Sequence, residues 1–185
     1  MGASPFSSLK LSENNVPPIF APVSAEIRRI SLTSLIFSRN TAGIFRKDAE
    51  TYLAKLDALE GEVRQAVAQI PSSRRKVIST HDAFGYFAAA YGIQFIAPLG
   101  VSTESEASAR DIARIITQIK TEKIPAVFLE NISDPRLIRR ISAETGARIG
   151  GTLFSDSLTA EKGDAPTYID MVRHNIKALT SALAD

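Results

Sequence analysis

Three polar side chains that can bind a metal ion follow predicted strands directly, although about 75 positions separate the first from the last. His81 comes after the first strand, Glu130 with Asn131 after the third, and Ser155 with Asp156 after the fourth. Ligands of open α/β sheets bind outside the carboxyl ends of the strands, so we expect these side chains to meet at one edge. Imidazole with carboxylate suits zinc or manganese, and manganese is favoured as oxygen ligands increase. The pattern therefore predicts a metal site at this edge, with His81, Glu130 and Asp156 as the candidate ligands.

Each of these residues also has an ordinary structural explanation, because the loops at a sheet edge are polar in most α/β proteins. His81 could cap a helix after its strand, and Asp156 could be a turn or cap residue within Ser-Asp-Ser. Glu130 could be solvated at the surface or could hold another side chain in place. The other histidine, His174, falls inside the last predicted helix, where we expect a structural or surface role rather than metal binding.

The elements that must position these residues alternate regularly along the chain. Short apolar runs predict strands at 76–80, 94–97, 126–129 and within 147–154, and helices are predicted between and after them, the first at 83–91. The predicted helix signals are a capping box at Ser108 and Asp111, an Asp134-Pro135 start, and glycine ends at Gly92 and Gly146. We expect Gly150-Gly151 to form a turn at a strand end. This alternation predicts an α/β fold with a parallel four-stranded sheet and helices on both faces.

A long helix is predicted before the sheet. Its apolar stripe consists of Ala49, Leu53, Leu56, Val63, Val67 and Ile70, and Pro71 ends it. A helix of this length with a narrow stripe is expected to lie as a brace along a surface. Residues 1–39 are rich in proline and serine and are interpreted as an irregular N-terminal arm without assigned chemistry. The predicted organisation is therefore an arm at 1–39, a long helix at 40–70 and an α/β lobe at 71–185.

Composition and motifs exclude several classes of function. The 185 residues are 44% hydrophobic and 23% charged with a net charge of +2, which does not favour nucleic-acid binding. The sequence has no cysteine, so disulfides and thiolate metal sites are excluded. P-loop, GxGxxG and GxSxG motifs are absent, and no nucleophile–base pair is evident, so we expect no enzyme. No apolar run could span a bilayer, and the first residues lack the features of an export signal.

Several segments resemble the zinc- and manganese-binding solute-binding proteins of ABC metal importers. STHDAFGYFAAAYGI (79–93) is similar to the family segment in which His or Glu follows Ser or Thr and precedes an aromatic-rich helix. FLENISDPRL (128–137), GGTLFSDSL (150–158) and TYIDMVRHNIKAL (167–179) resemble later family motifs in the same order. The resemblance covers about residues 40–185.

The resemblance implies two α/β lobes joined by one long helix, with a metal ion held between the lobes by four side chains. It makes 40–70 the linking helix and 71–185 the C-terminal metal-binding lobe. His81 and Asp156 fall on the two ligands that this lobe supplies, and His rather than Glu at position 81 favours zinc. Glu130 is a candidate for orienting a ligand. The implied partners are a divalent metal ion and the ABC permease, in the periplasm or at the cell surface.

The first 39 residues depart from the family pattern, because the histidine motifs of the other lobe are missing and no histidine precedes His81. We therefore expect a truncated or rearranged product or a fragment, in which waters, a second copy or a full-length relative complete the coordination. The exposed inter-lobe face predicts self-association. The alternatives to metal binding in an importer are a protein–protein docking module, a remnant that no longer captures metal and, ranked last, a small α/β enzyme.

Overall fold

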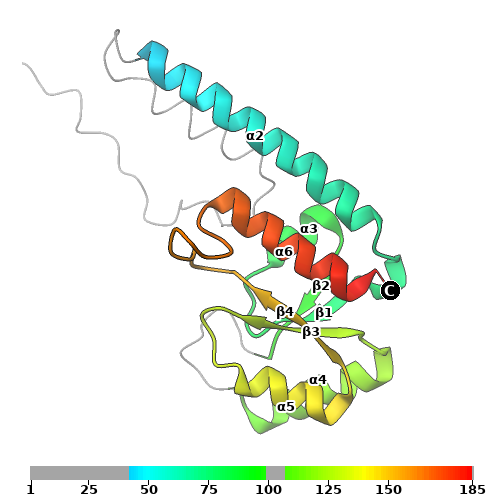
Figure 1. The fold of residues 1–185 in the computed structure, drawn as a ribbon. Helices are drawn as coiled ribbons and strands as arrows, with labels where there is room; N and C mark the ends of the chain where they lie inside the picture. The colour runs from blue at the N-terminus through cyan, green and yellow to red at the C-terminus, as the bar shows by residue number, and fades with distance from the viewer. Residues whose placement is uncertain (1–41, 99–106, 185) are drawn as a thin grey trace, which may run out of the picture.

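The computed structural model describes residues 42–98 and 107–184 (Figure 1). The irregular arm predicted at 1–39 lies outside the described residues, so that expectation stays a prediction. In the described part of the chain, no helix is both long enough and apolar enough to cross a membrane.

The centre of the fold is a parallel sheet of four strands, as predicted. The strands are β1 (Lys76–Ile78), β2 (Gln94–Ile96), β3 (Ala126–Glu130) and β4 (Arg148–Leu153), in the order β2-β1-β3-β4. The chain runs outward from β1 to β2 and then crosses back to β3 on the other side of β1. The carboxyl ends of β1 and β3 therefore flank the point where the strand order reverses, which is where ligands bind in open α/β sheets.

Helices cover both faces of the sheet, which confirms the predicted fold class (Figure 1). The helices are α2 (Ala42–Ala68), the 3-10 turn η2 (Ser72–Arg74), α3 (Gly85–Tyr91), α4 (Ala109–Glu122), α5 (Arg136–Thr145) and α6 (Tyr168–Leu183). Helices α4 and α5 lie on one face, α3 and α6 on the other, and α2 runs alongside α6 and packs against it. Gly92 and Gly146 end α3 and α5 in the left-handed conformation, as their positions predicted.

Two apolar clusters hold the layers together. The larger lies between the sheet and α2, α3 and α6, and includes Leu56, Phe84, Phe128, Leu153 and Leu179. The smaller lies between the sheet and α4 and α5, and its fully buried members are Ile78, Ile115, Val127, Ile138 and Ile141. Both faces of the sheet are thus buried, which explains why its strands are short apolar runs rather than alternating ones.

Helix α2 is packed along its second half only. Its buried side chains include Leu56, Leu59, Val63 and Val67, whereas Ile44, Phe45 and Tyr52 in the first half are exposed. The guanidinium of Arg173 on α6 donates hydrogen bonds of 2.7 Å from Nε and Nη2 to the two carboxylate oxygens of Glu62 on α2. The assignment of 40–70 as a linking helix and 71–185 as a separate lobe stays a prediction.

Gly150 and Gly151 lie inside β4, so the predicted strand-end turn is wrong. Val127 pairs with Ile149 and Leu129 with Thr152, so both glycines lie opposite Phe128 and the strand bulges there. A Cβ atom on Gly150 would approach the Phe128 ring within 2.5 Å and the Ala182 Cβ atom within 2.8 Å. Gly151 has a φ of +126°, which disfavours any larger residue. The glycine pair thus allows α6 to pack closely against β4.

Candidate metal site

His81 lies in the loop that follows β1, with its side chain almost completely buried. The Ser79 hydroxyl donates a hydrogen bond of 3.1 Å to the His81 carbonyl oxygen, and the Ala83 N–H donates to the same oxygen. These contacts fix the backbone of the loop before α3 begins at Gly85. The N-cap of α3 is Phe84 and has no side-chain cap, so the alternative role of His81 as a helix cap is not observed.

Glu130 is the last residue of β3, and its side chain has no exposed surface. Its Oε1 atom accepts hydrogen bonds from the backbone N–H groups of Thr80 and His81, at 2.7 and 3.0 Å. A buried carboxylate with two backbone donors is strongly held in place. The interpretation of Glu130 as a solvated surface residue is wrong, and the alternative that it holds another side chain in place is the one observed.

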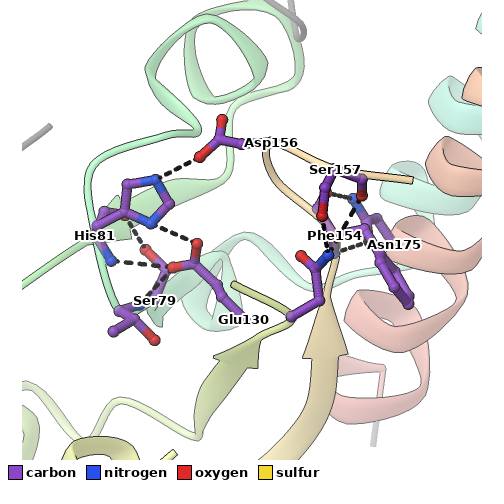
Figure 2. A network of polar contacts seen from close by, with 9 residues as sticks. Ser79, His81, Glu130, Phe154, Asp156, Ser157 and Asn175 are labelled. Carbon is purple, nitrogen blue, oxygen red and sulfur yellow. Dashed lines mark hydrogen bonds and ion pairs between the residues drawn. The ribbon is translucent and has the colours of Figure 1, made fainter. Parts of the chain in front are cut away.

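The imidazole of His81 lies between two carboxylates (Figure 2). Nδ1 lies 2.5 Å from Oε2 of Glu130, and Nε2 lies 3.0 Å from Oδ2 of Asp156. The Nδ1 contact is an ion pair by distance, although its angle falls outside hydrogen-bond geometry. A carboxylate can only accept, so Glu130 favours a proton on Nδ1 and directs Nε2 toward Asp156.

Asp156 follows β4 by three residues, and its side chain is 48% exposed. The buried imidazole thus meets a carboxylate that reaches solvent. The Asp156 side of the pair is therefore the side that faces solvent. The 75 positions between the two residues are bridged because β1 and β4 both end at this edge, on either side of β3.

The geometry fits a cation between Nε2 and Oδ2. Metal–ligand bonds of about 2.0–2.2 Å place two ligand atoms about 2.8–3.6 Å apart for ligand angles between about 90° and tetrahedral. The observed 3.0 Å separation lies within this range. Among the described residues, no group of three or more histidine, aspartate or glutamate side chains could hold a metal ion together.

Sequence reasoning missed Asn175, and it placed Asn131 at this edge of the sheet without assigning it a contact with the Asp156 loop. Asn175 on α6 is buried and bonds to the backbone of Phe154, and Asn131 after β3 bonds to Ser157. Asn175 could have been noticed because it is a polar residue within the apolar stripe of the last helix, which indicates a buried hydrogen-bonding side chain. His174 has the expected structural role, because its Nε2 atom lies 3.0 Å from the Thr152 carbonyl oxygen and its ring packs edge-on against Phe154.

Comparison with known proteins identifies the family. The model of the zinc-uptake complex component A, periplasmic (ZnuA), matches residues 34–182. The chain belongs to this family. It is 38% identical to the zinc-binding protein TroA of Treponema pallidum over 145 residues, which cover 76% of this chain and 47% of the relative. It is 35% identical to the manganese-binding lipoprotein MntA of Bacillus subtilis over 147 residues, which cover 77% of this chain and 48% of the relative.

A solved structure of periplasmic zinc-binding TroA from Treponema pallidum superposes on the chain with a TM-score of 0.83 and 31% identity. The match covers 97% of this chain and 69% of that structure. These matches confirm the predicted family. They also confirm the predicted fold, which is one lobe and the long helix of a two-lobe solute-binding protein. The chain spans about half the length of the curated relatives it matches.

Proposed function

We propose that this chain binds a zinc or manganese ion as the solute-binding component of an ABC metal importer, with His81 and Asp156 as its metal ligands. The observation that carries the proposal is the 3.0 Å separation of His81 Nε2 from Asp156 Oδ2 at the edge of the sheet where ligands bind. The names of TroA and MntA, which are zinc- and manganese-binding, support the same choice of ions.

Glu130 has the role of orienting His81 in this proposal. Metal-binding histidines usually donate their other ring N–H to a carboxylate, which fixes the tautomer and makes the ligand nitrogen more basic. Glu130 meets Nδ1 and also anchors the backbone of Thr80 and His81, so it sets the ring orientation from two sides. The ion would replace the direct contact between Nε2 and Oδ2.

His81 and Asp156 alone do not fill all the coordination positions of a zinc or manganese ion. Zinc in proteins takes four ligands, so water, a second copy of the chain or a full-length relative would complete the site. A larger share of oxygen ligands from those sources would favour manganese over zinc. In this proposal 40–70 is the linking helix and 71–185 is the metal-binding lobe.

The setting of this binding follows from the relatives. The family description is periplasmic, and relatives such as MntA are lipoproteins, so we place the chain in the periplasm or at the cell surface. Its partner there would be the ABC permease. Its role is binding and delivery rather than catalysis.

Calorimetric titration of the full chain with zinc and with manganese tests the proposal. The parent chain should give a saturable heat with at least one of the two ions. His81→Ala and Asp156→Ala should each abolish it, because neither remaining ligand holds the ion alone. Glu144→Ala removes an exposed carboxylate at the end of α5, near the start of β4 and so at the opposite edge of the sheet, and is the matched control that should bind like the parent. Unchanged binding in the His81→Ala, Asp156→Ala double variant would refute the assignment.

A protein–protein docking role is the second candidate. Tyr86, Ile132 and Leu158 are exposed apolar side chains that follow the ends of β1, β3 and β4, close in sequence to the proposed site. Exposed apolar patches often mark contact surfaces. This candidate predicts self-association or binding to a relative without metal. Light scattering coupled to size exclusion measures it, and a monomer at high concentration would exclude self-association.

A further inference from the structure

The position of Asp156 depends on the backbone around it. Among the described residues, the Asp156 carboxylate has its polar contact with His81 Nε2, and nearly half of the side chain is exposed. An exposed carboxylate in a loop would ordinarily sample several rotamers and backbone positions. Something must therefore hold the 153–157 segment for the 3.0 Å contact to persist.

Asn175 holds this segment from the α6 side. Its Oδ1 atom accepts a hydrogen bond of 2.9 Å from the Phe154 N–H, and its Nδ2 donates a bond of 2.7 Å to the Phe154 carbonyl oxygen. Strand β4 is at the edge of the sheet, so the Asn175 amide pairs with Phe154 as a further strand would. Figure 2 shows the two bonds, and both are buried.

Asn131 holds the side of the 153–157 segment that faces β3. Its backbone N–H donates to the Leu153 carbonyl oxygen at 3.1 Å, which extends the pairing of β3 with β4 by one bond. Its side-chain Nδ2 donates to the Ser157 hydroxyl at 2.6 Å and to the Ser157 carbonyl oxygen at 3.3 Å. Asp156 thus lies between Phe154, which is fixed from α6, and Ser157, which is fixed from the loop after β3.

We propose that Asn175 and Asn131 are positioning residues that hold the Asp156 carboxylate against His81, at the separation that a shared metal ion needs. The purpose of this clamp rests on the function proposed above, but the clamp itself is a property of the metal-free chain. The glycine pair in β4 supports it, because a Cβ atom on Gly150 would meet the Ala182 Cβ atom at 2.8 Å and push α6 away from β4.

The ¹⁵N NMR signal of His81 Nε2 in the metal-free full chain tests the clamp directly. Asp156→Ala removes the neighbouring carboxylate and defines the shifted signal. Asn175→Ala and Asn131→Ala should each move the signal toward that value. In the Asp156→Ala background, neither asparagine variant should move it further, because the clamp acts only through Asp156. A parent-like signal in both single variants, or a further shift in the double variants, would overturn the inference.

A matched control separates positioning from general stability. Leu179→Ala removes a buried side chain from the same helix but neither of the Asn175 hydrogen bonds to Phe154, so it should lower stability and leave the His81 signal in place. A Leu179→Ala shift equal to that of Asn175→Ala would count against the clamp. If Asn175→Ala does not fold, Asn131→Ala decides the outcome, because the side chain of Asn131 is exposed and its loss leaves the core intact.

Titration of the variants with zinc alone tests whether the clamp affects metal binding. Asn175→Ala and Asn131→Ala should weaken zinc binding, by about 10-fold or more, as is typical when a residue supporting a metal ligand is lost. Parent-like affinity in both would contradict the clamp's role in binding. No zinc or manganese binding by the parent chain would refute the proposed function, and the imidazole signal would still decide whether the asparagines hold Asp156.

Discussion

The Nε2 atom of His81 lies 3.0 Å from Oδ2 of Asp156, although 75 positions separate them in the sequence. The side chain of His81 is buried and that of Asp156 is about half exposed, so the pair lies at the boundary between the protein interior and solvent. Glu130 fixes the histidine from within, and backbone contacts fix the aspartate from both sides. Each prediction below changes one part of this arrangement.

Glu130→Gln should weaken metal binding while keeping the fold. Its Oε1 still accepts from the Thr80 and His81 N–H groups, so its NH₂ group must face His81 Nδ1. Nδ1 then has to accept, and the ring proton moves to Nε2, which blocks the ligand position. We expect a loss of about 10–100-fold in zinc affinity. Calorimetry measures the affinity, and ¹⁵N NMR of the imidazole reports the tautomer.

Glu130→Ala is the contrasting variant, because it also removes the acceptor of two buried backbone donors. We expect the free energy of unfolding to fall by about 2–6 kcal/mol, at about 1–3 kcal/mol for each of the two donors left unpaired. Urea denaturation gives the value. A Glu130→Gln chain as unstable as Glu130→Ala would contradict the division between anchoring and orienting roles.

Gly150→Ala should destabilise the chain, because the new Cβ atom would meet the Phe128 ring and Ala182 at 2.5 and 2.8 Å. Overpacking of this kind costs about 1–3 kcal/mol of unfolding free energy. Gly61→Ala is the matched control: Gly61 lies in α2 with no atom near its Cβ position, so alanine there should raise stability by about 0.5–1 kcal/mol. Equal effects of the two substitutions in urea denaturation would contradict the close packing of α6 on β4.

The pair of Glu62 and Arg173 should contribute little to stability, and only above the acidic range. The hydrogen bond from Arg173 lowers the pKa of Glu62 in the folded chain. The ion pair therefore stabilises the fold fully at pH values above the pKa of Glu62 in the unfolded chain, and this stabilisation is lost as the pH falls through the lower pKa of the folded chain. The pair is exposed, so Glu62→Gln should cost less than about 1 kcal/mol at neutral pH. Denaturation at several pH values measures it, and a difference that grows toward acid pH would contradict the assignment.

Much of the fold could be predicted from local sequence signals. All four strands were expected within one or two residues of their observed ends, since each is a short apolar run bounded by turn residues. Ser108 is the N-cap of α4, as predicted, with its hydroxyl oxygen accepting from the Asp111 N–H. The convergence of His81, Glu130 and Asp156 on one edge followed from the rule that parallel strands end together.

The remaining features depend on tertiary contacts that local patterns do not encode. Gly150-Gly151 has the sequence of a turn, and only the approach of Phe128 and Ala182 places the pair within a bulged strand. Glu130 has the sequence of a surface residue, and only the neighbouring β1 loop supplies the donors that bury it. Asn175 pairs with Phe154 across 21 positions, which no helical periodicity predicts.

Anomalous diffraction at the zinc absorption edge, on crystals of the zinc-loaded full chain, tests the central claim most directly. The account predicts an anomalous peak about 2 Å from both His81 Nε2 and Asp156 Oδ2, in place of their direct contact. A peak bound elsewhere, with His81 and Asp156 still in contact with each other, would contradict it.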